Sequence, residues 1–219
     1  MAKPRRLNLP VIEASLRAVQ RDFEHINSQL ETRRDPLSEL VIEHMMAGYR
    51  QVDGLLAERI DPFALGSSRA LLELNFLVIC GSDRLLRAEC AAALAATEER
   101  FYAKGDGSFE SLAEWVRLHA AESVRRRAAG AYVHVLSEPQ LYIEGNHRTG
   151  ALLMSWMLAR EGEPPFVLSV DNAKAYFDPS SAVKATRKHS LQMLLNRPKY
   201  VKRLSALLVD GKEKDRLLR

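Results

Sequence analysis

Residues 140–162 read QLYIEGNHRTGALLMSWMLAREG, a short loop followed by an apolar stretch that ends in glycine. Asn146 is a favourable residue for a helix start, and Gly162 is a favourable residue just past a helix end. The two prolines at 164 and 165 cannot continue a helix. The sequence therefore predicts an amphipathic helix that begins at Asn146 and is closed by Gly162.

The first sixty residues predict a helical hairpin. Apolar residues recur at alternating steps of four and three, which is typical of one long amphipathic helix with a narrow seam. Asp35 and Pro36 suit the N-cap and first turn of a second helix. The seam consists of Ile12, Leu16, Val19, Phe23, Ile26 and Leu30.

Further helix signals follow along the chain, and residues 166–170 are the single candidate for an extended segment. The sequence as a whole therefore predicts an all-α fold. One helix is expected from Ser67 or Ser68 to Gly81, and a second from Asp83 to about Lys104. A third is expected from a capping box at Ser111 and Glu114 to about Leu136. The last helices are expected to begin near Asp171 and Pro179.

Composition bounds the class of protein. The 219 residues are 47% apolar and 27% charged, which is ordinary for a globular domain. No apolar run is long enough for a membrane span, and the N-terminal residues do not resemble a signal peptide. Cys80 and Cys90 lack metal-ligand spacing and are expected to be buried thiols. We therefore expect a cytoplasmic protein without membrane contact.

Positive charge is concentrated at the C-terminus. From Lys184 onward the chain has eleven Lys or Arg residues against three acids. A basic tail, here residues 198–219, can attract nucleic acid or an acidic partner, but it is more often the solvated face of a terminal helix. Nucleic acid is not expected as a partner, because Tyr200 has no aromatic neighbours with which to stack bases.

The start of the helix at Asn146 carries groups that suit a phosphate. The first amides of a helix have no intrahelical partner, and the helix dipole makes that end partly positive. Gly145, Asn146 and His147 would supply such amides, and Arg148 would add a permanent charge. Glu144 could hold a Mg²⁺ ion that bridges phosphates.

An ordinary helix start explains the same residues. Asn caps helices well, and Gly turns tightly before them. Glu144 and Arg148 are spaced i, i+4, so they could form a surface ion pair worth about 0.2–0.5 kcal/mol. Spacing alone leaves both interpretations open.

Residues 140–151 resemble the signature of Fic-domain proteins, His-x-Phe-x-(Asp/Glu)-Gly-Asn-(Gly/Lys)-Arg-x-x-Arg. The resemblance implies a Fic-like helical bundle over residues 61–197, with the hairpin of residues 1–60 as an N-terminal extension and residues 198–219 as a basic C-terminal helix. It also implies ATP or another nucleotide as ligand, since most studied members move AMP from ATP to a hydroxyl side chain of a target protein.

The resemblance assigns roles to individual positions. Glu144 falls at the metal-binding acid, and Gly145 and Asn146 fall at the turn that forms the anion hole. Arg148 falls at the first phosphate-binding arginine. Tyr142 takes the place of the aromatic residue that packs beneath the loop.

Three positions depart from the signature. Gln140 stands where the family has its catalytic histidine, His147 where it has a small or basic residue, and Ala151 where it has the second arginine. A positioned base contributes about 10²–10⁴-fold in rate, and a charge-assisted contact about 1.5–3 kcal/mol. AMP transfer to protein hydroxyls is therefore expected to be impaired or lost, while binding of a phosphorylated ligand needs neither residue.

Two alternatives stay open at this point. The chain could be an active transferase of nucleotidyl or phosphate groups that uses non-standard residues, with His147, or less plausibly His134, as substitute base. It could also be a helical protein-interaction module that forms a homodimer through the N-terminal hairpin.

Overall fold

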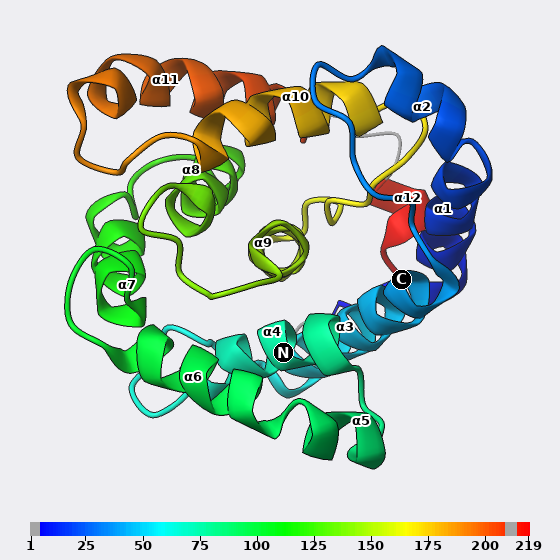
Figure 1. Cartoon of the computed structure of the whole chain (residues 1–219), viewed down its shortest axis with the longest axis horizontal. Helices are drawn as coiled ribbons and strands as arrows, with labels where there is room; N and C mark the ends of the chain where they lie inside the picture. The colour runs from blue at the N-terminus through cyan, green and yellow to red at the C-terminus, as the bar shows by residue number, and fades with distance from the viewer. Residues whose placement is uncertain (1–4, 209–213) are drawn as a thin grey trace.

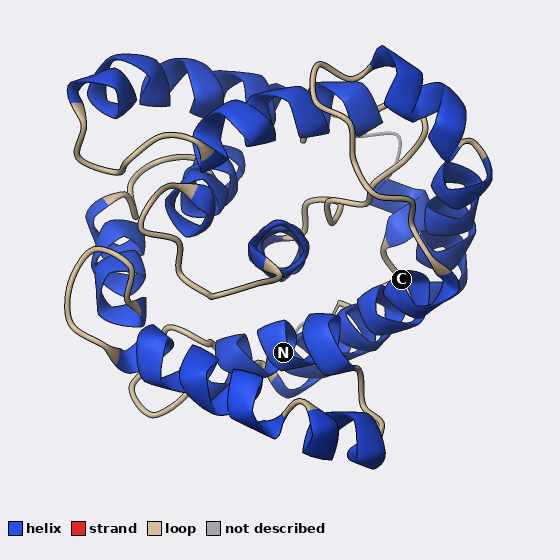
Figure 2. Cartoon of the chain, viewed as in Figure 1, coloured by secondary structure: helices blue, strands red, loops and turns tan. Residues whose placement is uncertain are grey.

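The computed structural model describes residues 5–208 and 214–219, and every regular element in these residues is an α-helix (Figures 1 and 2). Residues 166–170 form no strand, so the all-α prediction is confirmed. No described helix has the length and apolar character needed to cross a bilayer. The helices are α1 (Leu9–Arg21), α2 (Phe23–Gln29), α3 (Glu39–Glu58), α4 (Arg69–Cys80), α5 (Arg84–Glu89), α6 (Ala91–Tyr102), α7 (Phe109–Leu118), α8 (Val124–Leu136), α9 (Asn146–Glu161), α10 (Ala173–Lys184), α11 (Leu191–Ala206) and α12 (Lys214–Leu217).

Helix α9 lies at the centre of the molecule, and Figure 1 looks down its axis with other helices around it. Its bounds agree with the predicted start at Asn146 and end at Gly162. It is not amphipathic as expected, because every residue from 149 to 159 is buried. Three turns of buried residues leave no face for solvent, and α3, α4 and α8 pack against it.

One apolar core extends across the predicted domain boundaries. Ile42 and Leu56, before residue 60, belong to the same cluster of buried side chains as Leu71 and Leu152. Leu204 of α11 belongs to it too, although it lies beyond the predicted boundary at residue 197. Within the predicted basic tail, residues 209–213 lie outside the described part of the chain.

The N-terminal seam is buried inside the molecule. The predicted single helix is divided at Asp22 into α1 and α2, but all six seam residues are at most 9% exposed. Those of the second half pack with Ala173 of α10 and with the partly buried Phe177. The apolar seam that motivated a homodimer is therefore already covered within one chain.

Two helix starts differ from the prediction, because in each case a serine three residues away from the predicted position caps the helix. Helix α3 begins after Ser38, not Asp35, and the Ser38 hydroxyl accepts a hydrogen bond from the amide of Val41. Helix α7 begins after Ser108, not Ser111, with the same type of cap. In both cases the serine is extended and its oxygen satisfies a first-turn amide.

Some predicted long helices are pairs of shorter ones. The helix expected up to Leu136 is divided into α7 and α8, so that the chain folds back and the two helices contact each other. The helix expected from Asp83 to Lys104 is divided at Cys90 into α5 and α6. Both cysteines are free thiols, but only Cys80 is fully buried. Pro179 lies inside α10 and not at a helix start.

We expect Gly48→Ala to destabilise the protein by about 1–3 kcal/mol, because it overpacks the contact between α3 and α9. A Cβ atom at Gly48 would overlap Cδ1 of Leu152, which is fully buried. Gly54→Ala in the same helix is the matched control, since a Cβ there meets no atom within 4 Å. The control should gain about 0.5–1 kcal/mol from helix propensity. Urea unfolding measures both, and an equal effect of the two substitutions would contradict the close approach of these helices.

Candidate functional site

Buried Lys188 and partly buried Arg100 hold the loop that connects α8 to α9, which we call the α8–α9 loop. Nζ of Lys188 donates hydrogen bonds to the carbonyls of Ser137, at 2.8 Å, and Pro139. Arg100 donates from Nε and Nη2 to the carbonyl of Gln140, at 2.9 and 2.6 Å. Burial lowers the pKa of Lys188 to about 7, and the amine carries N–H donors in both protonation states.

The side chain of Asn146 braces the same loop from within. Its Oδ1 accepts from the amide of Tyr142 at 2.9 Å, and its Nδ2 donates to the carbonyl of Tyr142 at 2.8 Å. Tyr142 is buried beneath the loop, as predicted, with its ring stacked on Phe101 at 5.7 Å between centroids. Asn146 therefore fixes the loop with its side chain, and its backbone amide is what it can offer to a ligand.

Gly145 is the N-cap of α9 and has a left-handed backbone, with φ 75° and ψ 8°. A Cβ atom there would lie 2.9–3.0 Å from Ile79, Asn75 and Val78 of α4, so neither the conformation nor the space admits a side chain. Nδ2 of Asn75 also donates to the carbonyl of Glu144 at 2.9 Å. Helix α4 thus packs directly against the N-terminal end of α9, residues 144–148, which we call the mouth of α9. The first backbone amides of α9 lie next to this contact.

Glu144 lies at the surface beside this mouth. Among residues 5–208 and 214–219, no group of three or more His, Cys, Asp or Glu side chains is arranged to hold a metal. A single exposed carboxylate fits Mg²⁺ only when phosphate oxygens and water complete its coordination. The residues present are thus compatible with Mg²⁺ that arrives with a phosphorylated ligand, not with a resident metal.

The side chain of Arg148 faces α4. Its Nη1 donates to the carbonyl of Val78 at 2.5 Å, in the last turn of α4, where carbonyls lack intrahelical partners. Burial lowers the pKa of Arg148, and the charge of Glu144 opposes this effect. The bond to Val78 uses only one of the guanidinium's five N–H donors, and the expected contact between Arg148 and a phosphate stays a prediction.

The ring of His147 points away from the mouth into a polar cluster. Its Nδ1 lies 3.1 Å from the hydroxyl of Tyr132, and its Nε2 lies 3.5 Å from Nη1 of Arg34. Burial, and then the charges of Arg34 and Lys184, lower the pKa of His147 to about 3. Such an imidazole is neutral at physiological pH and is a weak proton acceptor, which disfavours His147 as the substitute base.

The other two candidates for base chemistry are also held by structural contacts. Gln140 donates from Nε2 to the carbonyl of Leu136 at 3.1 Å, and it has no basicity of its own. His134 is 6% exposed and lies 3.1 Å from the hydroxyl of Ser111. Burial lowers the pKa of His134 far below its ordinary value. None of the three is arranged to take a proton from an incoming hydroxyl.

Ala151, where the signature has its second arginine, lines a small cavity of about 80 Å³. Side chains of α1, α3 and α10 form most of its wall, including Leu16, Val41 and Phe177. The cavity is far below the 300–1,000 Å³ typical of small-molecule pockets. His147 and Arg148 also line it, but a cavity of this size has too little space for a terminal phosphate.

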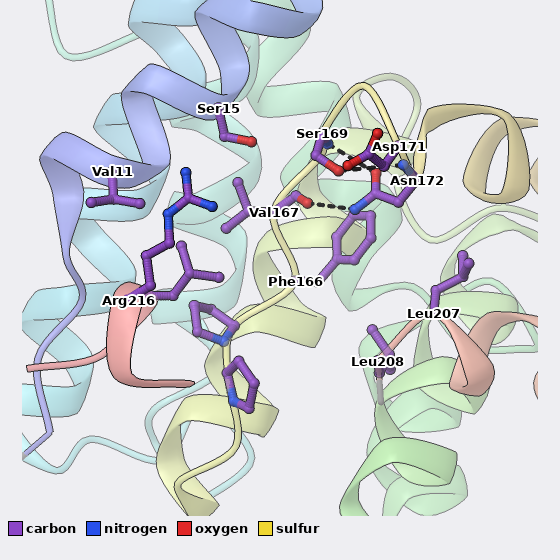
Figure 3. A pocket seen from close by; sticks show the side chains of 13 residues that line it. Val11, Ser15, Phe166, Val167, Ser169, Asp171, Asn172, Leu207, Leu208 and Arg216 are labelled. Carbon is purple, nitrogen blue, oxygen red and sulfur yellow. Dashed lines mark hydrogen bonds between the residues drawn. The ribbon is translucent and has the colours of Figure 1, made fainter. Parts of the chain in front are cut away.

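A larger cavity of about 270 Å³ lies elsewhere, between α1, the segment after α9 and the C-terminal helices (Figure 3). Phe166 and Val167 form part of its apolar floor, while Ser169, Asp171 and Asn172 lie together at one side (Figure 3). Nδ2 of Asn172 donates a hydrogen bond to the carbonyl of Val167 at 2.8 Å, and Oδ1 of Asn172 accepts one from the backbone amide of Ser169. None of the residues that line this cavity belongs to the mouth of α9.

Sequence reasoning missed several residues that shape the site. Arg34 reaches His147 from 113 positions away and donates to Ser181 at 2.6 Å. Lys188, Arg100 and Asn75 hold the α8–α9 loop from other parts of the chain. These contacts join segments that are distant in sequence, and no local pattern announces them.

Comparison with known proteins adds no relative. Neither a protein-family model, nor a curated protein, nor a solved structure matches this chain. The geometry of the residues around Gly145 is therefore the basis on which a function can be proposed.

Proposed function

We propose that the chain binds the phosphate of a nucleotide, or of another phosphorylated ligand, at the N-terminus of α9. The observation that carries the proposal is the conformation of Gly145, which is left-handed and pressed against α4 where no side chain fits. The amides of Gly145, Asn146 and His147 then start a long buried helix, and the helix dipole favours an anion at that end.

The rigidity of the α8–α9 loop supports a binding role over a simple helix start. A helix needs only its cap, but here Lys188, Arg100, Asn75 and Asn146 all hold loop carbonyls in place. A loop that is already ordered loses little conformational entropy when a ligand binds. The exposed Glu144 is the member of the loop whose side chain stays available at the mouth.

Mg²⁺ would join the site with the phosphate. Glu144 would provide its protein ligand, and the ion would neutralise charge on the phosphate oxygens. The proposal therefore predicts that Mg²⁺ strengthens binding of nucleotides and that the metal alone binds weakly.

The same arrangement argues against orthodox AMP transfer. Gln140 offers no basicity, His147 is a weak base within a hydrogen-bonded cluster, and Ala151 faces an apolar cavity. We therefore propose a cytoplasmic protein with a Fic-like fold that binds a nucleotide but does not transfer AMP. Transfer of label from α-labelled ATP to any protein would contradict the claim that AMP is not transferred.

Titration calorimetry and thermal shift with ATP, ADP, AMP and GTP test the binding directly. We expect saturable binding that Mg²⁺ strengthens. In the presence of Mg²⁺, Glu144→Gln should weaken nucleotide affinity about tenfold, or about 1.4 kcal/mol. In the absence of Mg²⁺, the same substitution should change the affinity little. Glu138→Gln, an exposed acid of the same loop, is the matched control and should behave like the wild type. No heat and no thermal shift at millimolar ligand would sink the proposal.

Substitution of Ala151 tests whether the ligand avoids the cavity. Ala151→Leu should fill the 80 Å³ space and raise stability by about 1–2 kcal/mol, without changing affinity for nucleotides. Ala151→Arg should lower stability by about 2 kcal/mol or more, because it buries a charge among apolar side chains. Denaturant unfolding and nucleotide titration report the two effects. A stable Ala151→Arg variant with higher affinity for ATP would mean that a phosphate does enter this space.

A further inference from the structure

Helix α11 exposes an unusual group of leucines. Leu191, Leu194 and Leu195 are 72%, 63% and 66% exposed. Single exposed apolar side chains are ordinary, but three within five residues of one helix form a patch. This patch is independent of the mouth of α9, because α11 lies at the periphery of the molecule (Figure 1).

Exposed cations continue the same face of the helix. At roughly 100° per residue, the three leucines and the three cations lie within about half of the helix circumference. The opposite side carries Met193 and Leu204, which are buried in the core. We call this surface the α11 face, and it consists of Leu191, Leu194, Leu195, Lys199, Lys202 and Arg203.

No acidic residue of the same segment compensates this charge. The sequence contains no Asp or Glu between Asp178 and Asp210, a stretch that includes all of α11. Arg197, on the inner side, lies over the ring of Trp115 and does not contribute to the α11 face. The α11 face is therefore both apolar and cationic.

We propose that the α11 face docks on an anionic lipid surface, in contrast to the absence of membrane contact expected from the sequence. The leucines would enter the boundary between headgroups and acyl chains, and the cations would contact lipid phosphates. The helix would lie on the bilayer and not cross it, with its inner side still packed on the rest of the protein.

Composition favours lipid over a macromolecular partner. Protein interfaces are depleted of lysine and enriched in aromatic residues, whereas the α11 face has two lysines and no aromatic side chain. Nucleic acid would use the cations but would leave three leucines in water. A lipid surface satisfies both halves of the face at once.

Vesicle co-sedimentation with the full chain tests the docking. One set of vesicles contains equal amounts of phosphatidylglycerol and phosphatidylcholine, and the other contains phosphatidylcholine alone. At about 0.1 M salt we expect the wild type to sediment with the anionic vesicles only, and binding should weaken as salt rises. Absence of sedimentation with anionic vesicles even at low salt would overturn the proposal.

Two variants of the α11 face identify the residues responsible. Lys199, Lys202 and Arg203 changed together to Gln should weaken binding roughly a hundredfold, since each cation near an anionic surface is worth about 1 kcal/mol. Leu191, Leu194 and Leu195 changed together to Ser should weaken binding at least about tenfold. All six positions are exposed, so both variants should unfold like the wild type.

Matched controls lie on other surfaces. The control for the leucines combines Leu65→Ser and Leu118→Ser, at leucines that are 105% and 64% exposed. The control for the cations combines Arg21→Gln, Arg33→Gln and Lys104→Gln, which removes three exposed positive charges. Both controls should bind vesicles like the wild type. Equal loss in controls and α11 variants would overturn the proposal. If vesicles do not bind, two other results would also overturn the proposal. One is a wild-type dimer that dissociates in the leucine variant, and the other is nucleic acid retained by the same cations.

Discussion

The burial of α9 on every side is the constraint on which the rest of the structure depends. A helix whose residues 149 to 159 are all buried has no lateral surface to offer, so only its ends can meet a ligand. At its N-terminus the backbone meets α4 so closely that Gly145 must lack a side chain and adopt a left-handed conformation. The direction of the first amides follows from that contact and not from the local sequence alone.

Three polar side chains of the motif then serve the protein's own packing. Asn146 braces the α8–α9 loop, Arg148 satisfies a carbonyl in the last turn of α4, and His147 joins the cluster with Tyr132 and Arg34. The groups left for a ligand are backbone amides and the carboxylate of Glu144. Such a set can bind an anion, but it has no member suited to take a proton. The α11 face is a separate surface with its own chemistry, apolar and cationic.

Local signals predicted the parts of the structure that local forces determine. The bounds of α9, the end of α4 at Gly81 and the burial of Tyr142 could all be expected from caps, breakers and apolar spacing. The breaks at Asp22 and Cys90 could not, because each depends on how the flanking helices pack. Apolar periodicity also predicted a seam at the N-terminus, but it could not tell that the same chain covers this seam.

The site divides in the same way. The sequence predicted which residues gather at the mouth of α9, since they are neighbours along the chain. It could not predict where their side chains point, because Val78, Tyr132 and Arg34 come from distant segments. The contact of Arg148 with Val78 could not be predicted from the sequence, and the expected contact of Arg148 with a phosphate stays a prediction.

A titration of the ¹⁵N-labelled protein with AMP, followed by amide chemical shifts, tests the central claim most directly. If the mouth of α9 binds phosphate through its backbone, the amide signals of Gly145, Asn146 and His147 should show the largest changes, and these changes should saturate. If those three signals stay in place while AMP perturbs another region or none, the anion site at Gly145 does not exist and α9 is only the central helix of a helical fold.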